Sequence, residues 1–172
     1  MKGYLEKRFH YLFTGESFAV IMFIFLSFLL NKVYPSLKLY SLYSFWCSFF
    51  LLEFLLVQGS MYWYSKWNRL RKENISVTPI RVVQRLEKLK RWNIWLIIII
   101  PVSFLIDFLT YYSSLPARGL SIAVFIYIFA ILEYINYFHI QLSYDNCADI
   151  NYLIKHKRLK QACLSKDFER IK

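Results

Sequence analysis

Four hydrophobic stretches, each long enough to cross a lipid bilayer, alternate with polar segments along this chain of 172 residues. They cover residues 17–34, 41–63, 93–112 and 119–142. A membrane-spanning helix needs ~20 consecutive, mostly apolar residues, whereas a core helix of a soluble protein seldom contains so many in a row. Inside hydrocarbon the backbone must satisfy its own hydrogen bonds, and these stretches lack the alternation typical of a barrel strand. The pattern therefore predicts an all-α, polytopic membrane protein with four transmembrane helices.

The basic residues are distributed unevenly between the polar segments. Of 22 lysines and arginines, three precede the first span, nine lie in the 65–92 loop and seven follow residue 142, while the short segments 32–40 and 113–118 hold the other three. This asymmetry follows the positive-inside rule and predicts that both termini and the 65–92 loop are cytoplasmic. It also accounts for the net charge of +11 without nucleic-acid binding, and it directs the basic residues toward an anionic inner leaflet.

The 65–92 loop and the 143–172 tail are the two predicted cytoplasmic segments. Thr78 and Pro79 are typical of a helix N-cap followed by proline at the first helical position. After them, apolar residues recur at helical spacing beside a basic face formed by Arg81, Arg85 and Lys88. Two arrangements remain open: an amphipathic helix lying on the membrane surface, or a solvated extension of the third span. The tail is predicted to form one or two amphipathic helices, folded back on the inner surface or holding a partner, and residues 1–16 to form an amphipathic helix at the inner interface.

Ionisable residues inside the spans are the main functional candidates. Glu53, Asp107 and Glu133 lie one in each of the last three spans, and Glu16 lies near the inner boundary. A charge near the bilayer centre costs ~2.5–3.5 kcal/mol on insertion scales, so such groups usually face the protein interior. Two interpretations follow: a proton or cation path, or protonated carboxyls that hydrogen-bond across helices to groups such as Asn136, Gln58, Ser103 or a tyrosine hydroxyl.

The fourth span is the most polar, and it adds Asn136 and His139 to the candidate residues. A metal site requires histidine and carboxylate three or four positions apart on one helix face, whereas Glu133 and His139 are six apart. No phosphate-binding glycine loop and no nucleophile–base set can be identified, so the sequence predicts no metal, no cofactor and no catalytic residues. Pro101 within the third span predicts a kink there.

Three segments carry a resemblance to a known group of proteins: residues 133–145, 159–168 and 11–17. In these segments the chain resembles small bacterial membrane proteins that are sometimes labelled general stress proteins and that have no defined activity. The resemblance implies a bacterial plasma-membrane protein and a link to stress. It implies no mechanism.

Three functions are compatible with these features. The first is a non-enzymatic accessory or interaction subunit, assembled with itself or with a partner through the loop and tail. The second is a small homo-oligomeric channel or proton-coupled transporter that uses Glu53, Asp107 and Glu133. The third is an intramembrane enzyme acting on a lipid or quinone beside Asn136 and His139.

Overall fold

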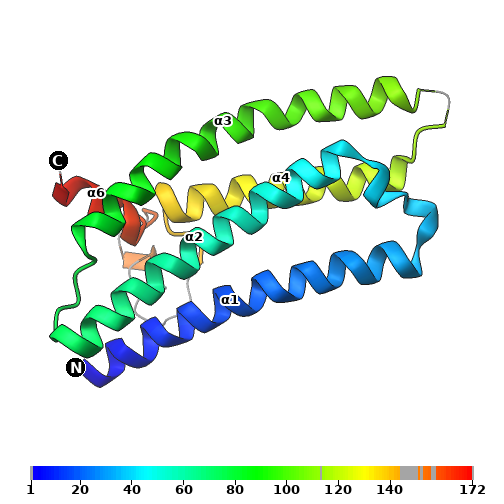
Figure 1. Cartoon of the computed structure of the whole chain (residues 1–172). Helices are drawn as coiled ribbons and strands as arrows, with labels where there is room; N and C mark the ends of the chain where they lie inside the picture. Colours follow the sequence, from blue (N-terminus) through cyan, green and yellow to red (C-terminus); the bar gives the residue numbers. More distant parts are fainter. Residues whose placement is uncertain (1, 113, 144–150, 152, 156–157, 172) are drawn as a thin grey trace.

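The structure, a computed structural model, describes residues 2–112, 114–143, 151, 153–155 and 158–171 (Figure 1). Four helices are long and apolar enough to cross a membrane, as the hydrophobic pattern predicts. Within the described residues the backbone is helical apart from short connections and one isolated antiparallel bridge between Ile140 and Gln161. The elements are α1 (Lys2–Val33), η1 (Pro35–Leu37), η2 (Leu39–Ser41), α2 (Tyr43–Glu73), α3 (Ile80–Thr110), α4 (Ala117–Phe138) and α6 (Cys163–Ile171).

Helix α2 lies at the centre of the bundle and packs against α1, α3 and α4 (Figure 1). Its leucines Leu51, Leu52 and Leu55 are fully buried or nearly so. In contrast, α1 exposes a broad apolar surface along its span, including Phe18 and Phe25. A helix with this surface requires an apolar surrounding such as lipid or another protein.

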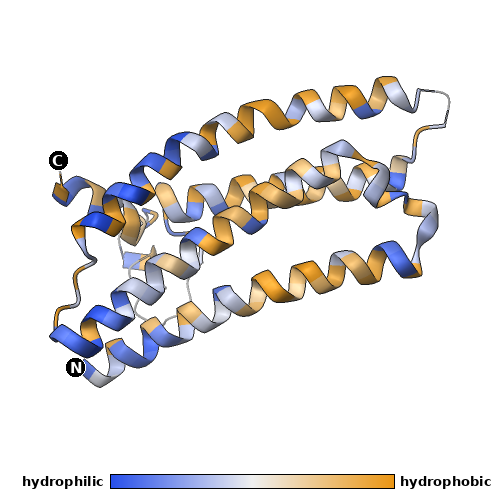
Figure 2. Cartoon of the chain, in the orientation of Figure 1, coloured by the Kyte–Doolittle hydropathy of each residue, from blue (hydrophilic) through white to orange (hydrophobic). Residues whose placement is uncertain are grey.

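Polar residues concentrate at one end of the bundle, which holds the start of α1, the end of α2, the start of α3 and helix α6 (Figure 2). We call this the basic end. The helices extend well beyond the apolar spans here, so the 65–92 loop is reduced to a linker at residues 74–79. The linker begins where Asn74 takes a left-handed conformation (φ 59°) and ends α2.

The basic face predicted within the 65–92 loop belongs to α3, which is one continuous helix. Val83 and Leu86 are buried in the protein core, while Arg81, Arg85 and Lys88 are exposed. Of the two arrangements that the sequence left open, the structure therefore has the extension of the third span. The apolar face packs against protein and is unavailable to the membrane surface.

Two local predictions differ from the structure. Helix α3 begins at Ile80 with Pro79 as its N-cap, and the Thr78 hydroxyl donates to Asp167 instead of capping the helix. Residues 2–16 are the first part of α1 and not a helix of their own, and their Phe9 is buried and stacks on Trp63 of α2 at a centroid distance of 5.9 Å. In both cases a tertiary contact replaces the local pattern that the prediction relied on.

Candidate functional site

The polar residues predicted within the spans lie in separate places and do not form one path. Asp107 is fully buried at the end of the bundle opposite to the basic end. Its Oδ1 accepts the backbone N–H of Tyr43 at 3.0 Å, and its Oδ2 accepts that of Ser44 at 2.8 Å. These are the first amides of α2, which lack intrahelical partners, so Asp107 of α3 caps a neighbouring helix.

Glu53 lies near the middle of α2, two positions from each of the fully buried Leu51 and Leu55. Neither of its carboxyl oxygens is accessible, and neither has a hydrogen-bond partner among the described residues. Gln58, which was predicted to be a partner of such a carboxyl, instead exchanges two amide hydrogen bonds of 3.0 Å with Asn93 of α3. Ser103 donates to the carbonyl oxygen of Ile100 in its own helix.

Glu133 and Asn136 contact each other, one turn apart on α4. The Asn136 amide donates to Oε2 of Glu133 at 3.2 Å, and its oxygen accepts the backbone N–H of Leu142 at 2.8 Å. The same helix face presents Tyr137, whose hydroxyl donates to Oε2 of Glu16 on α1. Glu16 and Tyr137 are 121 positions apart, so only the folded structure identifies them as partners.

Gly59 of α2 makes the contact between Tyr137 and Glu16 possible. A Cβ atom at position 59 would lie only 2.7 Å from the hydroxyl oxygen and Cζ of Tyr137, closer than atoms of this kind approach. The tyrosine ring therefore crosses α2 at a position that only glycine leaves open. This arrangement joins α1, α2 and α4 near the basic end.

Glu16, Glu133, Asn136 and Tyr137 line a groove with a volume of about 360 Å³. One wall is the α1 face that carries Gly15, Glu16 and Ala19, and the other is the α4 face that carries Phe129 and Glu133. Leu56, Tyr62 and Trp63 of α2 contribute to the lining between the two walls, and residues 162–164 contribute at the basic end. We call this cavity the α1–α4 groove.

His139, the remaining candidate, does not line the groove. It is the C-terminal residue that caps α4, it is exposed, and its ring lies 5.5 Å from that of Tyr134. Its carbonyl oxygen accepts the backbone N–H of Ala162 at 3.1 Å, which connects α4 to the tail. Among the described residues, no group of three or more histidine, cysteine, aspartate or glutamate side chains is placed to hold a metal ion.

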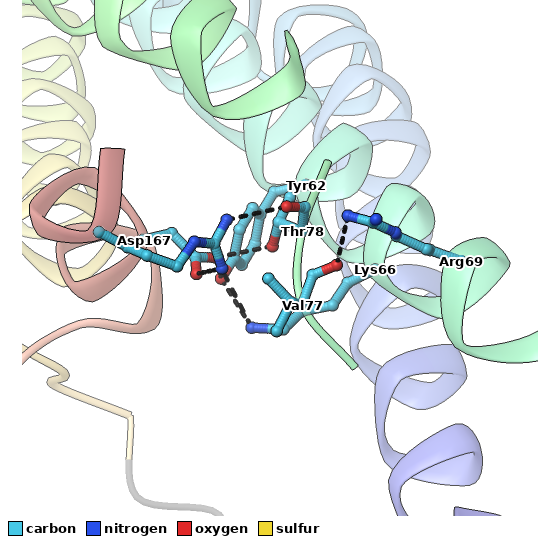
Figure 3. A network of polar contacts seen from close by, with 7 residues as sticks. Tyr62, Lys66, Arg69, Val77, Thr78 and Asp167 are labelled. Carbon is cyan, nitrogen blue, oxygen red and sulfur yellow. Dashed lines mark hydrogen bonds and ion pairs between the residues drawn. The ribbon is translucent and has the colours of Figure 1, made fainter. Parts of the chain in front are cut away.

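A second polar cluster holds helix α6 against the basic end of the bundle (Figure 3). Oδ2 of the buried Asp167 accepts hydrogen bonds from the hydroxyls of Tyr62 at 2.8 Å and Thr78 at 2.6 Å. Oδ1 of Asp167 pairs with Arg170 at 3.0 Å, and Lys66 lies 3.8 Å from Oδ2. We call these five residues the tail latch.

Apolar contacts support the tail latch. Phe168 is buried and stacks nearly parallel on Phe138 of α4 at a centroid distance of 6.1 Å, and Leu164 is buried beside it. The ammonium of Lys90 lies 6.0 Å from the centre of the Phe168 ring. Helix α6 is thus folded against α2, α3 and α4, whereas residues 144–150 of the predicted amphipathic tail lie outside the described residues.

The tail latch has only a faint signature in the sequence. Asp167 is one of several charged residues in an amphipathic tail, and its partner Tyr62 is 105 positions away. The only available signal was the helical spacing of Leu164 and Phe168, which marks the buried face on either side of Asp167.

Comparisons with known protein families, with curated proteins and with solved structures find no match for this chain.

Proposed function

We propose that this chain is a non-enzymatic accessory or interaction subunit of a bacterial plasma membrane, with both termini cytoplasmic. The observation that carries the proposal is the tail latch, which fixes α6 against α2 and α3 and so makes the basic end one ordered surface. An ordered surface loses little conformational entropy when it binds a partner. Its exposed residues Arg81, Arg85 and Lys88 give it a positive charge, which suits an acidic partner or an anionic leaflet.

The orientation rests on the positive-inside rule and on the polarity of the basic end (Figure 2). A cysteine introduced at Ser76, in the exposed linker between α2 and α3, tests it directly. In whole cells a membrane-impermeable maleimide should label Ser36→Cys, in the exposed outer loop, and should label Ser76→Cys only after the membrane is permeabilised. Both variants are made in a background without native cysteines. The reverse labelling pattern would overturn the proposed orientation.

A photo-crosslinking amino acid at Gln84, which is exposed between Arg81 and Arg85, tests the partner. In native membranes we expect one discrete crosslinked protein product, either with a second copy or with another protein. The triple variant R81Q/R85Q/K88Q should lose this product while its expression and topology remain normal. The control variant K38Q/R118Q removes exposed charges at the opposite end and should retain the product. Crosslinks to lipid alone, or a product that the triple variant leaves unchanged, would refute the interaction role.

A channel or proton-coupled transporter is the second candidate function, and Glu53 favours it. Its carboxyl group is buried without a partner among the described residues, in the middle of a helix long enough to cross the membrane. If transport is the function, proteoliposomes containing the wild-type protein should carry protons and Glu53→Gln should abolish the flux at normal expression. If the accessory role is correct, Glu53→Gln should leave the crosslinking at Gln84 unchanged and no flux should be measured for either protein.

A further inference from the structure

The α1–α4 groove changes in polarity along its length. Phe23, Leu56 and Phe129 line it at the level of the apolar spans, Glu16 and Glu133 follow, and Arg8 lies toward the basic end. Arg8 and Phe23 are fifteen positions apart on one helix, which corresponds to about 22 Å along its axis. The groove therefore extends from the polar boundary into the apolar layer. Its polar and apolar parts follow each other as do the headgroup and chain of an amphiphile in a membrane.

Two carboxyl groups dominate the polar part of the groove. The hydrogen bonds that hold Glu16 and Glu133 in place use Oε2 of each residue. Oε1 of each has no partner among the described hydrogen bonds, and a carboxylate has ~4 lone-pair sites, so both groups retain capacity to accept hydrogen bonds. In an apolar layer this capacity favours a ligand that carries donors and positive charge.

Aromatic rings form much of the remaining lining. Tyr11, Phe23, Trp63, Phe129 and Tyr137 all contribute to the groove. The face of an aromatic ring attracts a cation within about 6 Å, and the attraction is strongest where water is excluded. Carboxyl groups and aromatic rings thus favour the same ligand charge. The volume of about 360 Å³ lies within the range typical of small-molecule sites.

The order of groups along the groove distinguishes between classes of amphiphile. In a phospholipid the phosphate is joined to the acyl chains through glycerol and comes before any headgroup amine. A phospholipid in this groove would therefore bring its phosphate, and not an amine, toward Glu16 and Glu133. Like charges would then face each other in an apolar layer. In a long-chain amine the nitrogen is attached directly to the chain, so its ammonium reaches the carboxyls while the chain extends toward Phe23.

We propose that the α1–α4 groove binds a lipophilic amine, with the ammonium held by Glu16 and Glu133 and the hydrocarbon chain lying along Phe23, Leu56 and Phe129. This site is independent of the basic surface and of the partner proposed above. It assigns the two carboxyls of the groove to ligand binding, and leaves Asp107 as a helix cap.

Calorimetric titration of the full chain in phosphatidylcholine nanodiscs tests the site, with empty nanodiscs as the reference. The probes are dodecylamine, dodecanol and dodecyl sulfate, which share one chain length and differ in headgroup charge. We expect dodecylamine to bind at least tenfold more tightly than dodecanol, with no saturable binding of dodecyl sulfate. Equal affinity for the amine and the alcohol, or tighter binding of the sulfate, would overturn the proposal.

Two kinds of variant locate the binding. The isosteric double variant E16Q/E133Q keeps acceptors for Tyr137 and Asn136, so it should fold and lose the preference for the amine. E53Q removes an intramembrane carboxyl outside the groove and should bind like the wild type.

Gly15→Leu adds a side chain where a Cβ atom meets no other group within 4 Å, so it should occupy the groove and weaken binding without a clash. Gly3→Leu, equally unhindered but outside the groove, is its control, and identical binding by all four variants would refute the site.

Discussion

Tyr127 of α4 donates its hydroxyl hydrogen to the backbone carbonyl oxygen of Ile97 in α3 at 2.8 Å. Ile97 lies four positions before Pro101, and in a regular helix its carbonyl would accept the N–H of residue 101. Proline has no N–H, so the helix leaves this carbonyl without its usual partner. Helix α3 nevertheless continues through Pro101 without a break (Figure 1). The Tyr127 hydroxyl, from the neighbouring helix, gives the Ile97 carbonyl oxygen the hydrogen bond that the proline cannot give.

Removing this hydroxyl should destabilise the bundle only when the proline is present. Tyr127→Phe leaves the Ile97 carbonyl unpaired in an apolar layer and should lower the free energy of unfolding by about 1 kcal/mol, as other interhelical hydrogen bonds in membranes do. In a Pro101→Ala background, the backbone N–H of the introduced alanine can reach the same carbonyl, and the cost of Tyr127→Phe should fall. Unfolding in mixed micelles measures the four proteins of this cycle. An equal cost in both backgrounds would show that the hydroxyl has no relation to the proline.

Asp107 should contribute to stability through the two amides that it accepts. Asp107→Ala leaves the N–H groups of Tyr43 and Ser44 unpaired, and we expect a loss of about 1–2 kcal/mol, the usual cost of losing a helix N-cap. Asp107→Asn retains one oxygen acceptor and should lose roughly half of that. Thr110→Ala, an exposed change on the same helix, is the control and should unfold like the wild type. If Asp107→Ala also unfolds like the wild type, the capping contact does not stabilise the bundle.

Hydrophobic length was sufficient to predict the four helices, because an apolar run of this length has few other stable states in a membrane. It did not predict where the helices end. Both α2 and α3 continue far into polar sequence, since Val83 and Leu86 are buried against protein beyond the apolar run. The ends were nevertheless encoded locally: Asn74 adopts the left-handed conformation that ends α2, and Pro79 caps the start of α3.

The candidate residues could be identified from the sequence, but the contacts that each of them makes could not be predicted. A charged side chain within a span is conspicuous wherever it lies, so Glu53, Asp107 and Glu133 were identified. Their partners could not be, because Asp107 bonds to backbone amides 63 and 64 positions away. Asn136 was predicted to accept or donate across helices, but it bonds to Glu133 within the same helix, at a spacing of three residues.

The two glycines near the α1–α4 groove should respond to the same substitution in opposite ways. Gly59→Ala places a Cβ atom 2.7 Å from the Tyr137 ring, so the ring must move away from Glu16. Overpacking of this kind usually costs about 1–3 kcal/mol. Gly15→Ala meets nothing within 4 Å and should stabilise the helix by up to about 1 kcal/mol. Thermal unfolding in detergent compares the two variants, and a Gly59→Ala protein as stable as Gly15→Ala would contradict the packing described for Tyr137.

Loss of the tail latch should release α6 from the bundle. Asp167→Ala leaves the hydroxyls of Tyr62 and Thr78 and the charges of Lys66 and Arg170 without their shared acceptor. Removing one partner of a largely buried ion pair typically costs about 3–5 kcal/mol. A helix of nine residues is not stable in isolation, so α6 depends on its contacts with the bundle.

Limited trypsin digestion after Lys160 reports this release, because the Lys160 carbonyl oxygen accepts the backbone N–H of Gln141 and the bond lies seven positions before residue 167, outside α6. We expect cleavage at least tenfold faster in Asp167→Ala than in the wild type, since proteolysis follows the population of the open form. Lys166→Gln removes an exposed charge on the same helix and should be cleaved after Lys160 like the wild type. Equal cleavage rates in all three proteins would show that the apolar contacts of Leu164 and Phe168 hold the tail without the latch.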